Sequence, residues 1–154
     1  MKKPFVIGIY GSSNSGKTTL LVELISHFKS KDFKVSSVKI SDKKIGFDNS
    51  GKDSYKYGEA GSELVVLSSE VETGFLIKEK LTIDDIISKI KQIGDYDIVF
   101  IEGANDKKTP KIRLGEIEER ENTIHDYFGD FLRLVNIIIE QMNKEIDRNE
   151  WFEN

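Results

Sequence analysis

A short segment near the amino terminus has the residue types and spacing that bind phosphate. Gly11 is followed after four residues by Gly16, Lys17 and Thr18, the pattern of a phosphate-binding (Walker A) loop. The glycines let the backbone turn sharply and approach a ligand, and N–H groups at the start of the next helix point at phosphate oxygens. Lys17 adds a positive charge, and the Thr18 hydroxyl would bind a magnesium ion that bridges the outer phosphates. The predicted nucleotide-binding residues are Gly11, Ser12, Ser13, Asn14, Ser15, Gly16, Lys17, Thr18 and Thr19.

The segments on both sides of this loop fit the motif. Phe5–Tyr10 is short, apolar and rich in β-formers, as in a strand that is buried on both faces. Apolar residues recur at helical spacing through Lys17–Lys29, which predicts an amphipathic helix. The plain alternative is a serine- and glycine-rich turn before a helix. Because the order strand, loop, helix is the context that the motif requires, we predict nucleotide binding.

Two carboxylates are candidates to accompany this loop. Glu102 directly follows a second apolar strand, Tyr96–Ile101, and ligands bind at the carboxyl ends of strands in an open α/β sheet. Glu102 is therefore a candidate to hold magnesium or a water molecule, the alternative being a carboxylate exposed in a turn. The other is Asp53, in the polar segment GKDSYKYGEAG (residues 51–61). The periodicity of that segment predicts only a polar loop followed by a short helix. It does not decide whether Asp53 contacts a metal.

Composition limits the class of protein. The chain has 154 residues, 38% hydrophobic and 32% charged, which is typical of one globular domain. No apolar run approaches the roughly 20 residues of a membrane helix and no secretory signal is visible, so we expect a cytoplasmic protein without a membrane span. Without cysteine there is no thiolate metal site, and His27 and His125 are too far apart for a local metal motif. The formal net charge of -4 argues against broad binding to nucleic acid.

Strand and helix patterns alternate along the rest of the chain. Thr82 and Asp85 form a capping box before a helical pattern of isoleucines that ends at Gly94, and a terminal helix begins near Asp130. Further strands are predicted at residues 35–40, 64–67, 75–77 and 111–114, and none is predicted at residues 115–129. The alternation predicts an α/β fold of three layers, a mainly parallel sheet with helices on both faces, in a single nucleotide-binding domain spanning residues 1–154.

Three segments together resemble one known family. GSSNSGKTTLL, GFDNSGKDSYKYGEAGS and DIVFIEGANDKKTPKIRL occur in the order and spacing of the MobB family, the accessory proteins of molybdopterin-guanine dinucleotide synthesis. The middle segment is the most informative one. Many families share a Walker A loop, but few share Gly-Lys-Asp-Ser-Tyr followed by Glu-Ala-Gly.

This resemblance implies a P-loop NTPase fold, usually a homodimer, that binds GTP with Mg²⁺ and hydrolyses it slowly at most. It implies as partner the guanylyltransferase that completes the molybdenum cofactor, or a molybdoenzyme. By motif, Thr18 and Glu102 become magnesium contacts and Asp53 a third. Lys39, at the end of the second strand, matches a family lysine near the outer phosphates and joins Lys17 as a candidate catalytic residue. The alternative for Lys39 is a structural role at a strand end.

The chain departs from the family at two places. Many members carry several histidines after that lysine, whereas this chain reads Ile-Ser-Asp-Lys-Lys at residues 40–44, so the contacts of those imidazoles are absent or replaced. Residues 115–129 are charged and lack the strand that the family tends to have near the nucleotide base. These residues therefore do not distinguish guanine from adenine, and ATP stays open as the ligand.

Two other functions stay open. One is an ATP-dependent ligase or kinase similar to dethiobiotin synthetase, which also combines a Walker A loop with a strand that ends in Glu-Gly. That class needs an acceptor pocket beside Lys17 and Lys39. The other is a scaffold that binds nucleotide without hydrolysing it, which the intact Lys17-Thr18-Thr19 disfavours. No general base stands out, and this fits slow turnover because positioning and charge neutralisation supply most of the rate in such loops.

Overall fold

The computed structural model describes residues 3–44, 46–48 and 52–152. The chain divides into two compact units. One unit, here called the sheet unit, contains residues 1–40 and 83–154, and the other, the insert unit, contains residues 41–82. That the whole chain acts as a single domain stays a prediction.

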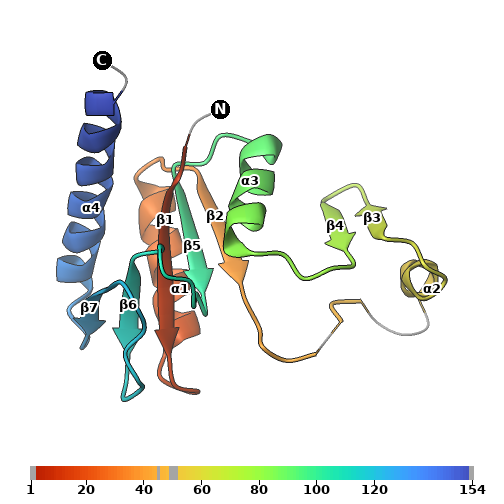
Figure 1. Ribbon diagram of the computed structural model, residues 1–154, viewed down its shortest axis with the longest axis horizontal. Coiled ribbons are helices and arrows are strands. Elements are labelled where there is room, and N and C mark those ends of the chain that lie inside the picture. Colours follow the sequence, from red (N-terminus) through yellow and green to blue (C-terminus); the bar gives the residue numbers. More distant parts are fainter. Residues whose placement is uncertain (1–2, 45, 49–51, 153–154) are drawn as a thin grey trace. The chain divides into compact units, whose positions relative to one another are not determined.

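The sheet unit is built on five parallel strands. In the first half of the chain it contains β1 (Phe5–Gly11), α1 (Lys17–Ser30) and β2 (Val35–Lys39). After the insert unit come α3 (Ile83–Ile93), β5 (Ile98–Glu102), β6 (Lys111–Leu114), β7 (Thr123–Tyr127) and α4 (Phe131–Phe152). The strand order is β2-β5-β1-β6-β7, and every neighbouring pair is parallel (Figure 1). The carboxyl ends of all five strands therefore meet at one edge of the sheet.

Helices cover both faces of this sheet, which explains why its central strands are so apolar. Ile7, Ile9 and Phe100 are completely buried, in a core that also contains side chains of α1 and α4. Val99 and Ile101 point to the other face, where isoleucines of α3 pack against them. Each such side chain contributes about 1.5–3 kcal/mol when it is fully buried. The predicted three-layer α/β fold is confirmed.

The predicted strands and helices are present, and their ends lie within about two residues of expectation except at α4, which continues to Phe152, past the apolar repeat that predicted it. The prediction of no strand at residues 115–129 is wrong. β7 lies there and pairs with β6 at the edge of the sheet. Arg113 of β6 forms a two-point ion pair with Asp126 beside it, at 2.6 and 2.9 Å. Every residue of β7 is half-buried, so the strand has no fully buried face that would require an apolar residue at every second position. The strand is defined by its neighbour rather than by a hydrophobic pattern of its own.

The insert unit contains a short helix and a hairpin, α2 (Asp53–Glu59), β3 (Leu64–Ser68) and β4 (Thr73–Ile77). β3 and β4 pair antiparallel and form a two-stranded sheet of their own. Ser69 holds the turn between them, because its Oγ accepts the N–H groups of Val71 and Glu72. This connection is too short for a parallel pair, which needs a crossover of about a dozen or more residues. The alternation of elements along the chain did not indicate this hairpin.

The helices are amphipathic or short. Within the described residues, none is long and apolar enough to cross a membrane.

Candidate nucleotide-binding site

The predicted phosphate-binding loop joins β1 to α1 and contains two left-handed backbone positions. Gly16 has a φ of 91° and Asn14 a φ of 60°, conformations that glycine and asparagine adopt most readily. A β-carbon at Gly16 would meet no atom within 4 Å, so glycine is favoured there by its φ. Gly11 is needed for space, because a β-carbon there would lie 2.5 Å from the carbonyl oxygen of Leu114 and 2.7 Å from Ser15 Oγ. The two glycines thus set the path of the loop.

Lys17, the first residue of α1, lies with its ammonium group against the loop. Its Nζ donates to the carbonyl oxygens of Gly11, at 3.0 Å, and Ser12, at 2.9 Å. The side chain is only half-buried, and Thr18 and Thr19 beside it are exposed. Hydrogen bonds between two charged groups are stronger than those to a neutral carbonyl. The ammonium group is therefore positioned to exchange these carbonyls for phosphate oxygens.

Ser15 places an unpaired polar group inside the loop. Its N–H donates to the carbonyl oxygen of Ser12 at 3.2 Å, while its Oγ is buried and has no hydrogen-bond partner among the described residues. Buried hydroxyl groups are nearly always paired in proteins. Gly115 borders the loop on the side of β6, where a β-carbon would lie 3.0 Å from Ser12 Oγ. The loop is thus closely packed against Gly115, while Ser15 Oγ stays without a partner among the described residues. This fits a site that binds a polar ligand.

Lys39 and Glu102 end two neighbouring strands at the same edge of the sheet. They are paired in the parallel register of β2 and β5, so their side chains point to the same face. It is the face of Ile98, which α1 covers. Glu102 is 9% exposed and is paired in register with Ile9, two residues before Gly11. The structure therefore brings Glu102 and the phosphate-binding loop to adjacent strand ends, with Lys39 on the far side of Glu102.

The described residues of the protein do not by themselves form a closed metal site. In the part of the chain that the structure describes, no group of three or more His, Asp or Glu side chains could hold a metal ion. Mg²⁺ keeps several waters and is usually bound by one or two carboxylates together with substrate phosphates. Glu102 and Thr18 fit that arrangement, in which the nucleotide supplies the remaining oxygens.

Asp53 belongs to the insert unit. It is exposed and is the first residue of α2, where a carboxylate interacts favourably with the helix dipole. This is a structural role that needs no metal. Gly51, the first residue of the segment at 51–61, lies outside the described residues. The contact between Asp53 and a metal ion stays a prediction.

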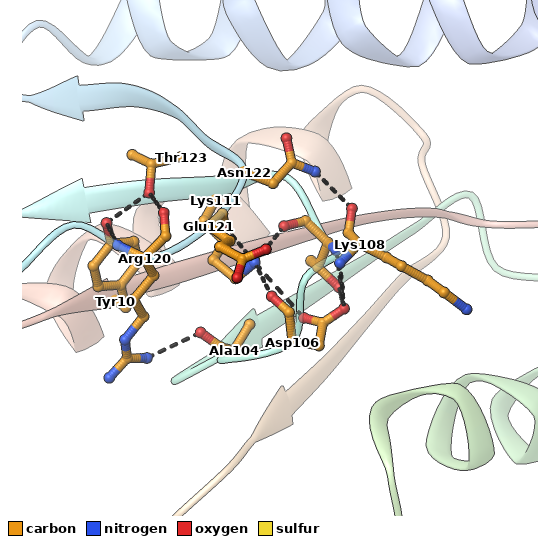
Figure 2. A network of polar contacts seen from close by, with 10 residues as sticks. Tyr10, Ala104, Asp106, Lys108, Lys111, Arg120, Glu121, Asn122 and Thr123 are labelled. Carbon is orange, nitrogen blue, oxygen red and sulfur yellow. Dashed lines mark hydrogen bonds and ion pairs between the residues drawn. The ribbon is translucent and has the colours of Figure 1, made fainter.

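A buried polar cluster centred on Lys111, which sequence reasoning missed, lies among the strand connections of the sheet unit (Figure 2). Lys111, the first residue of β6, is completely buried. Its Nζ donates to the carbonyl oxygens of Asp106, of Thr109 at 2.7 Å and of Glu121 at 2.8 Å. These acceptors match the three protons of an ammonium group. Lys111 thereby ties the connection between β5 and β6 to the connection between β6 and β7. A lysine opening a short apolar strand was the only local sign of it.

The carboxylate of Asp106 completes this cluster. Its Oδ2 accepts hydrogen bonds from the backbone N–H and the hydroxyl group of Thr109, both at 2.9 Å, and its Oδ1 lies 3.8 Å from Lys111 Nζ. Burial opposes the charged form, but the Thr109 hydrogen bonds and the Lys111 charge outweigh it, so the pKa of Asp106 is lowered. Burial also lowers the pKa of Lys111, and Asp106 opposes that shift. The surroundings therefore favour the charged form of Asp106, whereas at Lys111 burial outweighs the attraction of the carboxylate.

Comparison with known proteins identifies relatives along most of the chain. The sequence profile of MobB, described as molybdopterin guanine dinucleotide synthesis protein B, matches residues 6–136. A putative molybdopterin-guanine dinucleotide biosynthesis adapter protein of Methanocaldococcus jannaschii is 30% identical over 146 residues, which are 92% of this chain and 57% of that protein. An adapter protein of the same description from Haemophilus influenzae is 34% identical over 110 residues, 71% of this chain and 62% of that protein. The chain thus spans about three fifths of the length of these relatives.

Solved structures share the fold. The structure of MobB from Bacillus subtilis has a TM-score of 0.68 at 16% identity, over 88% of this chain and 96% of that one. A MobB protein homolog from Bacillus stearothermophilus has a TM-score of 0.61 at 18% identity, over 90% and 96% of the two chains. At these identities the likeness concerns the fold alone.

Proposed function

This chain belongs to the MobB family, and we propose that it is an adapter protein of molybdopterin-guanine dinucleotide synthesis that binds GTP with Mg²⁺ and hydrolyses it slowly at most. The observation that carries the nucleotide site is the loop between β1 and α1. There Lys17 Nζ lies within hydrogen-bond distance of two loop carbonyls, and Glu102 ends the next strand. The description of the curated relatives as adapter proteins supports the biological role.

In the proposed complex, the loop holds the phosphates. Backbone N–H groups at the start of α1 and the ammonium group of Lys17 would contact their oxygens. Thr18 and Glu102 would hold Mg²⁺, which supplies charge neutralisation at the outer phosphates. Lys39 adds a second positive charge beside Glu102, and Asp53 is proposed as a further metal contact.

Hydrolysis at this site needs no acceptor other than water. The bond between the terminal phosphorus and the bridging oxygen breaks, the oxygen of water forms the new bond, and the products are GDP and inorganic phosphate. The protons of water leave on the phosphate product or pass to solvent. Because this loop mainly positions and neutralises charge, the proposal is that the bound state, more than the turnover, acts on a partner.

The proposed partners are a second copy of this chain and the guanylyltransferase that completes the molybdenum cofactor, or a molybdoenzyme that receives it. The proposed location is the cytoplasm. A pull-down with the full chain from a cell that makes the cofactor tests this role. Recovery of such an enzyme is expected, and recovery of none would contradict the adapter role.

Calorimetric titration of GTP and ATP with Mg²⁺ tests the nucleotide site. The intact chain should bind GTP more tightly than ATP, and Lys17→Ala should weaken binding about 10- to 100-fold, as expected for the loss of a charge-assisted hydrogen bond. Lys29→Ala removes an exposed lysine near the end of the same helix and should change nothing.

Two results would contradict this proposal. In one, neither nucleotide binds the unmodified chain. In the other, ATP binds and a carboxylic acid accelerates its hydrolysis manyfold, which would identify a ligase or kinase.

A further inference from the structure

The turn that follows Glu102 is held in place at three points. The N–H group of Gly103 donates to the carbonyl oxygen of Ile9 at 2.8 Å. Ala104 is completely buried against β1, at a place where a β-carbon on Gly8 would lie 2.7 Å from its own. The third point is a charge-assisted hydrogen bond, in which Arg120 Nη1 donates to the carbonyl oxygen of Ala104 at 2.9 Å (Figure 2). The backbone beside Glu102 therefore depends on a side chain from the connection between β6 and β7.

Arg120 itself contacts the end of β1, just before the phosphate-binding loop. Its guanidinium carbon lies 4.8 Å from the centre of the Tyr10 ring, a cation–π distance. Its backbone N–H donates to the Tyr10 hydroxyl at 3.0 Å, and its carbonyl oxygen accepts the Thr123 hydroxyl proton at 2.6 Å. The 2.6 Å contact between the Tyr10 and Thr123 hydroxyls must then use the proton of Tyr10. Tyr10 is 1% exposed and precedes Gly11 directly, so this closed circuit connects Arg120 to the start of the loop.

Lys111 and Arg120 contact opposite ends of the connection between β5 and β6. Lys111 holds its far end, through the carbonyls of Asp106 and Thr109. Arg120 holds its near end at Ala104, two residues after Glu102. Lys111 is completely buried, so we assign it to the stability of the fold. Arg120 is only half-buried and contacts the backbone two residues after Glu102, so it is placed to orient the Glu102 carboxylate.

We propose that Arg120 is a positioning residue for the magnesium-binding carboxylate, holding the Glu102 turn in register with the phosphate-binding loop by bridging Tyr10 and Ala104. This role rests on the proposed function and deepens it. Among the described residues, Arg120 forms its hydrogen bonds with Tyr10, Ala104 and Thr123, and not with the loop N–H groups or Lys17, which would bind phosphate. Its loss should therefore weaken the binding of GTP that requires Mg²⁺ and leave metal-free binding of GTP nearly unchanged.

The test measures the dissociation constant of GTP for the full chain by calorimetry, once with Mg²⁺ and once with EDTA. Arg120→Met should weaken binding with Mg²⁺ about tenfold, at the low end of what residues that orient metal ligands contribute. With EDTA the change should stay below about twofold, less than a third of the 1.4 kcal/mol that corresponds to tenfold. Arg120→Lys, which keeps a charge and a donor, should recover part of the loss. Arg133→Met, at an exposed arginine of α4, is the matched control and should behave as the parent.

The outcomes separate the two proposals. Equal weakening with Mg²⁺ and with EDTA, or no weakening in either, would overturn the positioning role of Arg120 while leaving the nucleotide site intact. Failure of the unmodified chain to bind GTP would instead contradict the proposed function, and with it the role of Arg120. Circular dichroism establishes whether each variant is folded. If Arg120→Met is unfolded, the dissociation constants of Arg120→Lys with Mg²⁺ and with EDTA decide the test.

Discussion

Two lysines of the sheet unit both donate hydrogen bonds to backbone carbonyls, yet their surroundings differ. Lys17 is half-buried at the carboxyl edge of the sheet and donates to two carbonyls within the described residues, one fewer than the protons it carries. Lys111 is completely buried and donates to three carbonyls that belong to two strand connections. The first arrangement leaves a donor for a ligand, and the second leaves none.

This difference separates binding from stability. A half-buried cation at a loop exchanges acceptors at little cost, because water can still solvate it in the absence of ligand. A buried cation with all its protons paired resists change, since removing it leaves buried acceptors unpaired. Substitutions at Lys17 should therefore alter ligand affinity and spare the fold, whereas substitutions at Lys111 should do the reverse.

The largest effect is expected from Lys111→Met. Methionine has a similar length and no donor, so the carbonyl oxygens of Asp106, Thr109 and Glu121 would remain without that partner. The free energy of unfolding should fall by about 3–5 kcal/mol, as when one partner of a buried charged pair is removed. Urea unfolding followed by circular dichroism measures it, with Lys17→Met as the matched variant. If Lys111→Met cost no more than Lys17→Met, the contrast between the two lysines would be wrong.

A smaller loss of stability is expected from Gly11→Ala. The new β-carbon would overlap the carbonyl oxygen of Leu114 and Ser15 Oγ, and such overpacking costs about 1–3 kcal/mol. The loop would shift, so binding of Mg–GTP should fall as well. Gly46→Ala is the control, because a β-carbon there meets no atom within 4 Å. Unchanged unfolding and unchanged affinity in Gly11→Ala would show that the loop does not need this close approach.

Acid should produce the smallest effect, at Asp106. Its pKa is lowered in the folded chain, so its ionised form contributes stability above the unfolded pKa of about 3.9. That contribution is lost as the pH falls through the folded value. Asp106→Asn should therefore flatten the decline of the unfolding free energy between about pH 5 and pH 2. Urea midpoints at several pH values measure this, and parallel curves for the two proteins would exclude the role of the carboxylate.

Local patterns were sufficient to predict the loop and its flanking elements. Phe5–Gly11, the glycines and the helix that begins at Lys17 each carry their signal in consecutive residues. Glu102 was predicted because strand ends share one edge of a parallel sheet, a rule that needs only the order of elements.

The missed features depend on contacts between distant segments. β7 becomes a strand through its pairing with β6, and Arg113 meets Asp126 only in that register. In the sequence, Lys111 and Arg120 look like ordinary charged residues, yet each donates to backbone carbonyls of a strand connection other than its own segment. No periodicity within one segment indicates such a contact, because the acceptors are backbone atoms whose positions only the folded chain defines.

The most direct test of the central claim is urea unfolding of the intact chain and of Lys17→Met, each with and without Mg–GTP. At one hundred times its dissociation constant, the ligand should raise the unfolding free energy of the intact chain by about 2.7 kcal/mol. Lys17→Met should match the intact chain without ligand and gain much less with it. If Lys17→Met gained as much from Mg–GTP as the intact chain does, Lys17 would not be the residue that receives the phosphates.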